Sequence, residues 1–401
     1  MRTAIHSIRV IGLLSLMFAL PLNVLSMEQP GISNSQPDSA KTDNAQTRYF
    51  RHIMFRESPF APYRGIYPLD NTTSPEVAHY QFSQDKQGRI VQIRYQQKDT
   101  LIRANEVWDS FIWFAPRVDI AYDANTETHS YYDIQGNRIA AHGNVFSAVY
   151  ELNNNKQRVA LRFYDQQGNA AESAWHIHRY EWRHSGDKVY EKRFNLKDEQ
   201  QPLRPELTFY EVELEYDRDG KLAFMRNLGL TGEPTDNETG AGIDRITYDH
   251  NGNFIRWQVY SKDGKAVEGN RPMVHLGEHL YDADGNKVGL RGFDRYGKQI
   301  PFSWGVYEHV HKFNQFGNMV EHAMYNADGS LSRHLLIEYN PQQTEITWLK
   351  AVDKNRELVS SPMLGGAAAL QYDYQADGSA VRHLFNADMS TFNPPQQTTA
   401  E

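Results

Sequence analysis

The stretch that decides the fold is Tyr281-Asp282-Ala283-Asp284-Gly285-Asn286, an aromatic residue followed by Asp, two variable residues, Gly and Asn. An Asp at this position opens a tight turn by accepting hydrogen bonds from backbone N–H groups that follow it. Gly supplies the left-handed backbone conformation that closes the turn. Turns of this kind join neighbouring antiparallel strands, so the stretch predicts the tip of a β-hairpin.

The same pattern recurs along the chain. The other clear copies lie at 132–137, 164–169, 216–221, 248–253 and 313–318. Their glycines are spaced by 32 residues from 136 to 168, and by 32, 33 and 32 residues through 220, 252, 285 and 317. A second series of turns lies 12 residues downstream, at 260–264, 293–297 and 325–329. One repeat of about 32 residues therefore contains two turns.

The residues between the turns alternate with a period of two, as in 254–260, which is typical of strands and excludes an amphipathic helix. A single unit of this length cannot bury its own apolar face, so neighbouring units must pack together. The sequence therefore predicts an all-β fold. Tandem antiparallel β-hairpin repeats are expected to form one extended, twisted or spiralling sheet, either open or closed.

The Tyr-Asp-x-x-Gly-Asn motif resembles the YD repeat of bacterial RHS-type proteins. The resemblance covers roughly residues 130–390 and, more weakly, 78–130. It implies an exported protein that builds spiralling antiparallel β-sheet. The alternating spacing of 12 and 20 residues departs from the more uniform YD pattern, and the chain has no recognisable C-terminal toxin domain. Toxin encapsulation is therefore not part of what the resemblance implies.

The first 26 residues have the pattern of a cleaved export signal, with Arg2 and Arg9 before an apolar run that Pro21 interrupts. Such a run is too short and broken to predict a stable membrane span, which needs about 20 apolar residues. The chain has no cysteine and hence no disulfide or thiolate metal site. We expect a periplasmic or secreted bacterial protein.

The domain boundaries follow from composition. We expect a signal peptide (1–26), a flexible leader (27–47), a loop-rich and β-structured N-terminal region (48–130), the hairpin-repeat domain (131–392) and a flexible tail (393–401). Cleavage of the signal removes two arginines and no acid, which takes the net charge from −8 to −10. A negative chain disfavours nucleic acid as a partner.

Histidines provide the first candidate site. His275-Leu276-Gly277-Glu278-His279 matches the H-x-x-E-H zinc-peptidase pattern, but that chemistry needs a helix, and the segment has the pattern of a strand. His309 and His311 are two residues apart and so project from the same face of a strand. His279 occupies the position equivalent to His311 in the preceding repeat. The three predict a possible zinc site on stacked repeats, although strand-face histidines also form such pairs by chance.

A second pair, His176 and His178, has the same spacing and the same predicted strand geometry. Tryptophans form the other candidate site. Trp257, Trp304 and Trp348 recur along the repeats and are candidates for stacking platforms that bind a ligand such as a sugar.

Three functional hypotheses follow. The first is a non-enzymatic exported binding or scaffold protein, whose partner is another envelope or secreted protein or a polysaccharide. The second is a carbohydrate-binding protein that uses the aromatic platforms. The third is a metal-dependent hydrolase with a histidine cluster. The first requires no cofactor, and no catalytic residue is assigned.

Overall fold

The computed structural model describes residues 46–70, 75–103, 115–376 and 379–394. These residues form 24 antiparallel strands in one sheet that does not close on itself, which confirms the predicted all-β fold. The helical structure within these ranges is limited to a short 3₁₀ turn, η1 (Pro362–Leu364). No helix among the described residues is long and apolar enough to cross a membrane.

The strands follow each other along the sheet in almost sequential order. The N-terminal strands are β1 (Gln46–Ile53), β2 (Gly65–Pro68), β3 (His79–Gln84), β4 (Ile90–Gln97), β5 (Thr100–Leu101), β6 (Arg117–Tyr122) and β7 (Thr126–Tyr132). The next are β8 (Ser147–Leu152), β9 (Arg158–Tyr164), β10 (Arg179–Ser185), β11 (Lys188–Phe194), β12 (Glu211–Tyr216), β13 (Leu222–Gly229), β14 (Ile243–Tyr248) and β15 (Phe254–Tyr260). The last are β16 (Leu276–Tyr281), β17 (Lys287–Phe293), β18 (Gln299–Ile300), β19 (Glu308–Phe313), β20 (Met319–Tyr325), β21 (Leu331–Tyr339), β22 (Ile346–Ala351), β23 (Ala369–Tyr374) and β24 (Ala380–Phe385). There are three exceptions to sequential order. β1 lies between β2 and β3, β4 pairs with β6 beyond the short β5, and β17 pairs with β19 beyond the short β18.

The repeated turns have the chemistry that the sequence predicts. In the turn between β14 and β15, Asp249 Oδ1 accepts a hydrogen bond of 2.9 Å from the backbone N–H of Asn253, and Gly252 has a φ of +93°. The motif at 260–264 makes the same kind of turn, but it is closed only by an isolated bridge between Tyr260 and Ala266 and not by a full hairpin. The motifs therefore mark both full hairpins and short turns at strand ends.

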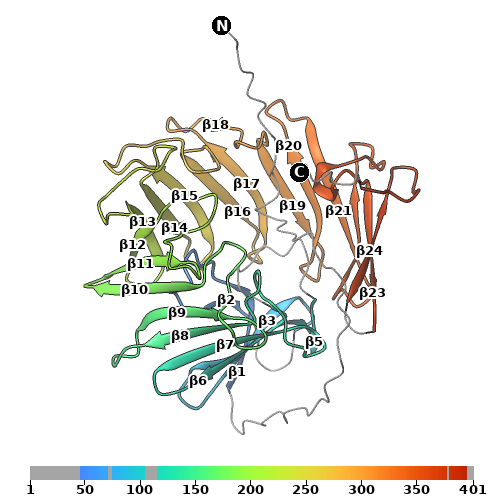
Figure 1. Ribbon diagram of the computed structural model, residues 1–401. Coiled ribbons are helices and arrows are strands. Elements are labelled where there is room, and N and C mark those ends of the chain that lie inside the picture. The colour runs from blue at the N-terminus through green and yellow to red at the C-terminus, as the bar shows by residue number, and fades with distance from the viewer. Residues whose placement is uncertain (1–45, 71–74, 104–114, 377–378, 395–401) are drawn as a thin grey trace, which may run out of the picture.

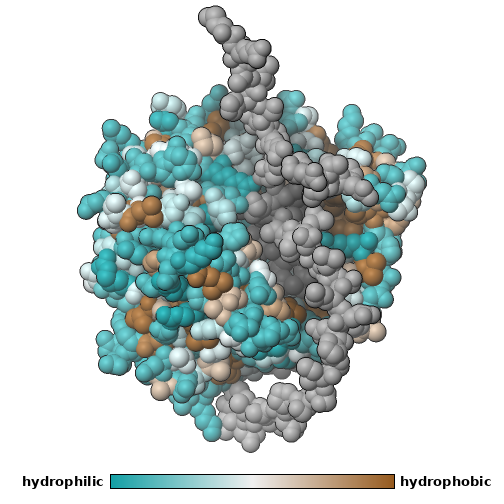
Figure 2. Space-filling model, in the orientation of Figure 1, coloured by the Kyte–Doolittle hydropathy of each residue, from teal (hydrophilic) through white to brown (hydrophobic). Residues whose placement is uncertain are grey.

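The sheet curves around a central space, so that its first strands lie close to turns of the later repeats (Figure 1). The backbone N–H of Ala78 donates to the carbonyl of Phe316 at 2.8 Å, and Asn253 Nδ2 donates to the hydroxyl of Tyr67 at 2.7 Å. These contacts join the region of β1 to β3 to the turns that precede β15 and β20. The described part of the surface drawn in Figure 2 is mainly hydrophilic, with scattered hydrophobic residues.

The connection between β1 and β2, residues 54–64, packs against the inner face of the sheet, and we call it the interior segment. Arg158 Nη1 donates to the carbonyl of Pro59 at 3.0 Å, and the hydroxyl of Tyr248 donates to the carbonyl of Phe55 at 3.2 Å. The ring of Phe55 stacks on Phe254, with 4.8 Å between centroids. The sheet thus satisfies the polar backbone groups of a segment that forms no strand of its own.

Buried apolar residues form two clusters, one spread over β1 to β15 and one over β19 to β24. Between them, the inner face of β16 and β17 carries Gly277 and Gly292, which pair directly across the two strands. The indole of Trp257 covers Gly277 so closely that an added Cβ atom would lie 2.0 Å from it. The side chains of Trp257, Val274 and Phe302 therefore occupy the space over these two glycines.

The predicted signal peptide, most of the predicted leader and most of the predicted tail lie outside the described residues. The first strand begins at Gln46 and so includes the last two residues of the predicted leader. Strands on both sides of residue 131 belong to one continuous sheet.

Candidate metal centre

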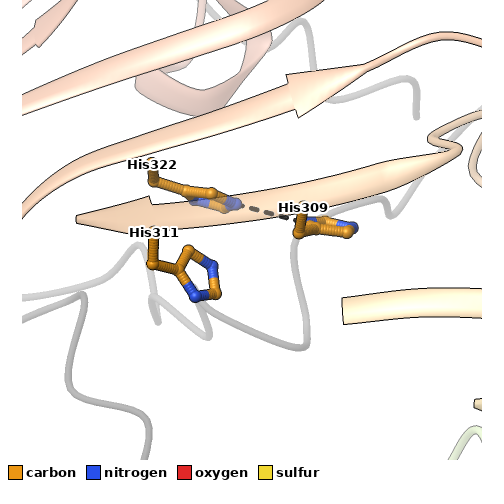
Figure 3. A group of neighbouring side chains, drawn as sticks. All are labelled: His309, His311 and His322. Atoms are coloured by element: carbon orange, nitrogen blue, oxygen red, sulfur yellow. Dashed lines mark hydrogen bonds between the residues drawn. The ribbon is translucent and has the colours of Figure 1, made fainter. Parts of the chain in front are cut away.

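Three histidines meet on the inner face of the β19–β20 hairpin. Along β19 the alternation of strand side chains buries His309 and His311 on the same face. On β20, His322 is also buried and stands directly opposite His311. One ring nitrogen from each histidine lies within 4.8 Å of those of the other two, and the rings face one another in Figure 3.

A β-bulge brings His322 into this group. The register between β19 and β20 shifts between Lys312 and Phe313, so that Lys312 pairs with Glu321 and His311 with His322. Across this step β20 has one residue more than β19. Without the extra residue, His311 would pair with Glu321, and His322 would project from the opposite face. The bulge therefore decides whether the hairpin presents two histidines or three on its inner face.

The hydrogen bonds define how the protons are placed. Trp304 Nε1, which can only donate, lies 3.3 Å from His309 Nε2, so His309 carries its proton on Nδ1 and donates to His322 Nε2 at 3.0 Å. His311 Nδ1 donates to the carbonyl of Lys287 at 2.8 Å, which leaves the lone pair of that ring on Nε2. A backbone carbonyl that holds the second ring nitrogen is the usual support of a metal-ligating histidine.

Burial keeps His309 and His322 neutral. Burial, with the charges of His311, Lys287 and Arg333 acting in the same direction, lowers the pKa of His309 to about 3. Burial also lowers the pKa of His322 well below its usual range. Neutral imidazole is the form that binds zinc, because its lone pair is available.

A buried nitrogen of the cluster lacks a hydrogen-bond partner. Among the described residues, His322 Nδ1 is buried without a hydrogen-bond partner. Because His322 Nε2 accepts from His309, the proton of the neutral His322 ring is on Nδ1, so this orphan is an N–H donor that suits a water and not a metal ion. A zinc ion at the cluster would take the place of the hydrogen bond between His309 Nδ1 and His322 Nε2, and His309 would have to give up its Nδ1 proton to bind it. Three imidazoles then match the ligand set of zinc sites that keep a fourth position open. The residues therefore fit a zinc ion.

The structure does not bring His279 into this group. His279 pairs with Leu290 on β17, and Leu290 pairs with His309, so the two histidines share a face but lie two strands apart. Two strand spacings amount to about 10 Å, beyond the reach of one metal ion. The expected adjacency is wrong because each repeat contributes two strands. His279 Nδ1 instead lies 2.9 Å from the carbonyl of Phe254.

The other two histidine patterns found in the sequence have different backbone geometries in the structure. All of the H-x-x-E-H segment except His275 lies within β16, and Glu278 pairs with Arg256 across the strands. It therefore has strand geometry, as the sequence predicts. His176 and His178 do not lie on a strand, and His176 is exposed in a turn with a φ of +58°. The expectation of a strand pair at this position is wrong.

The three candidate tryptophans do not share one surface. Trp257 and Trp304 are half-buried and line a cavity on the inner face. Trp304 stacks on Phe302 with 4.7 Å between centroids. Trp348 lies on β22 next to the inward-facing Leu349, so it projects the other way, and Lys350 Nζ lies 5.1 Å from its ring.

The cavity has a volume of about 470 Å³ and lies between the inner face of β13 to β21 and the N-terminal strands with the interior segment. Ligand pockets usually measure 300–1,000 Å³. The three histidines of the cluster line it together with His279 and Trp304. A metal ion at the cluster would therefore border a space large enough for a small molecule.

Acidic groups line the cavity at the strands before β16. Glu57 of the interior segment pairs with Arg204, and Glu206 pairs with Arg271 at 2.9 Å. Asp244, on β14, accepts a hydrogen bond of 2.9 Å from Asn270 Nδ2. Burial raises the pKa of Asp244 to about 7, and the charge of Glu57 acts in the same direction.

No family model matches the chain, and no curated protein matches it. Among solved structures, it is similar to a porin-like protein from Bacteroides vulgatus ATCC 8482, at 10% identity over 68% of this chain and 96% of that one, with a TM-score of 0.21. It is also similar to a putative 6-phosphogluconolactonase from Bacteroides fragilis NCTC 9343, at 9% identity over 86% of this chain and 95% of that one, with a TM-score of 0.12. TM-scores of this size carry no inference about function. The chain is therefore defined by its own features, a curved hairpin-repeat sheet with a histidine cluster on its inner face.

Proposed function

We propose that this chain is an exported binding protein that holds a zinc ion through His309, His311 and His322. The observation that carries the proposal is the convergence of three buried ring nitrogens within 4.8 Å of one another. The export signal in the sequence supports a periplasmic or secreted location, where the protein would meet an envelope or secreted protein or a polysaccharide.

A binding role is favoured over hydrolysis by the placement of the acids. A zinc hydrolase commonly uses a carboxylate beside the metal as a general base. Among the described residues, the acids that line the cavity are Glu57, Glu206 and Asp244, and each has a partner of its own. Asp244 lies on β14, four strands along the sheet from β19 when the short β18 is left out.

Zinc content and affinity test the proposal. We expect one zinc per chain in protein purified without chelators, and a loss of binding by a factor of at least about 100 in His322→Ala, because a removed ligand leaves only two donors. His279→Ala is the matched control, since it removes a histidine from the same cavity but not from the cluster. Wild-type protein without zinc would contradict the proposal, as would equal loss in the two variants.

A further inference from the structure

A buried acid, Asp244 on β14, lines the cavity at a distance from the histidine cluster. Asp244 stands between Met225 on β13 and Val259 on β15, and both of these neighbours are buried on the inner face. Asp244 itself is only 7% exposed, and it borders the cavity. Its carboxyl group therefore lies in an apolar part of the inner face.

A series of amides fixes the hydrogen bond that Asp244 accepts. Asn237 Oδ1 accepts from the backbone N–H groups of Thr239 and Ala241. Asn237 Nδ2 therefore donates to Asn270 Oδ1 at 2.9 Å, and Asn270 Nδ2 donates to Asp244 Oδ1 at 2.9 Å. No described residue donates a hydrogen bond to the second carboxyl oxygen, Asp244 Oδ2. This is uncommon, because a buried acid is costly without donors on its oxygens.

The other two acids of the cavity are balanced by arginines, whereas Asp244 is not. Glu57 pairs with Arg204, and Glu206 pairs with Arg271 at 2.9 Å. Within the described ranges, Asp244 forms no ion pair, and its polar partner is a neutral amide. A divalent metal ion needs several oxygen ligands. A single carboxylate instead suits a single positive charge that carries its own N–H donors.

Apolar side chains continue along the inner face from Asp244. Ile246 lies two residues further along β14 and so on the same face, and Trp257 is its partner on β15. Both side chains line the cavity. A ligand with its charged end at Asp244 would therefore have an apolar wall for the rest of its structure.

We infer that Asp244 binds the protonated amino group of a small organic amine, whose apolar part packs against Ile246 and Trp257. The ammonium group supplies both a donor for Oδ2 and the positive charge that this carboxylate lacks. The inference goes beyond the proposed function and does not depend on it, since Asp244 is on β14 and the three histidines are on β19 and β20.

Hexylamine and 1-hexanol are the probes, because they share an apolar chain and differ in the charged group. Isothermal titration calorimetry at pH 8 should show saturable binding of hexylamine and binding of hexanol that is weaker by about tenfold or more, because hexanol makes no charge-assisted contact. Asp244→Asn should weaken hexylamine binding about tenfold or more and leave hexanol binding unchanged. Asp263→Asn is the matched control, because it removes an exposed acid that does not line the cavity, and it should bind hexylamine as the wild type does.

The pH dependence tests the same contact in the wild-type chain. Burial raises the pKa of Asp244 to about 7, the charge of Glu57 acts in the same direction, and the charge of Arg204 opposes them. The proton and the amine compete for the carboxylate, so hexylamine should bind about tenfold more weakly at pH 6 than at pH 8. This dependence should disappear in Asp244→Asn.

A chelator should leave hexylamine binding unchanged, because the amine contacts Asp244 and not the metal. The inference is overturned if hexylamine does not bind, if hexanol binds equally well, or if Asp244→Asn and Asp263→Asn have the same hexylamine affinity. Loss of hexylamine binding in the presence of the chelator would also overturn it, since the amine would then be a ligand of the metal.

Discussion

At the scale of single residues, the candidate site depends on whether a side chain faces the inside of the sheet. His309 and His311 could be paired from the sequence, because residues two apart on a strand share a face. His322 was not among the predicted ligands, although a bulge is expected of this turn motif and the same one-residue shift recurs in the β14–β15, β16–β17 and β19–β20 hairpins. Only when that shift is applied to the register does His322 fall on the face of His311, because a shift of one residue reverses every side chain that follows it.

Asp244 provides a prediction about pH. Its folded pKa of about 7 lies above its ordinary value of 3.8, so the unfolded chain loses this proton at lower pH than the folded one. The free energy of unfolding therefore falls as the pH rises from about 4 to 7, by up to about 4 kcal/mol at 1.36 kcal/mol per pKa unit. Asp244→Asn keeps the oxygen that accepts from Asn270 and removes this penalty.

We expect Asp244→Asn to stabilise the protein by about 2–4 kcal/mol at pH 8 relative to wild type, and by much less at pH 4.5. Urea denaturation at the two pH values measures this difference. Asp263→Asn, at an exposed turn residue, should show no comparable pH-dependent gain. A stability difference for Asp244→Asn that does not change with pH would show that this carboxyl is ionised normally in the folded protein.

At the scale of elements, the repeated turns were the most predictable feature of the fold. The Asp and Gly of each motif act within a few residues of each other, so the sequence contains all the information that the turn needs. The curvature that brings these turns against β1 and β2 was not predictable in the same way. It depends on contacts between residues more than 180 positions apart, such as Asn253 with Tyr67.

Substitution of two glycines can distinguish a turn that packs against β2 from a turn that depends only on its own residues. Gly285 and Gly264 have nearly the same φ, +79° and +77°. An added Cβ at Gly285 would lie 2.5 Å from Tyr67 Cε2, whereas none of the described atoms lies within 4 Å at Gly264. Alanine at either site costs about 1–2 kcal/mol for the left-handed backbone.

Gly285→Ala should therefore cost about 1–3 kcal/mol more than Gly264→Ala, because it also forces Tyr67 and its neighbours to move. Thermal or urea unfolding of the two variants gives the comparison. Equal losses would mean that the turn at Gly285 does not pack against β2 in solution.

At the scale of the whole molecule, the open sheet is held in its curved shape by contacts between its first strands and its later repeats. Arg103, which follows β5, pairs with Glu345 between β21 and β22 through two hydrogen bonds of 2.9 and 3.0 Å. The two side chains are only 15% and 22% exposed. This pair joins positions that are 242 residues apart in the chain.

A double-mutant cycle with Arg103→Gln and Glu345→Gln should give a coupling free energy of about 1 kcal/mol, because the pair is largely shielded from solvent. Lys98 and Glu76, whose side chains are 60% and 73% exposed, are the comparison and should couple more weakly. Coupling no larger for Arg103 and Glu345 than for the exposed pair would indicate that the first strands separate from the later repeats in solution.

The central claim is that the inner face of this sheet holds a metal ion at His309, His311 and His322. Anomalous diffraction at the zinc absorption edge, from crystals of protein purified without chelators, tests it most directly. The account predicts one strong anomalous peak about 2.0–2.1 Å from a ring nitrogen of each of the three histidines. A crystal of zinc-supplemented protein with no peak at this cluster, or with its peak at His279 instead, would contradict it.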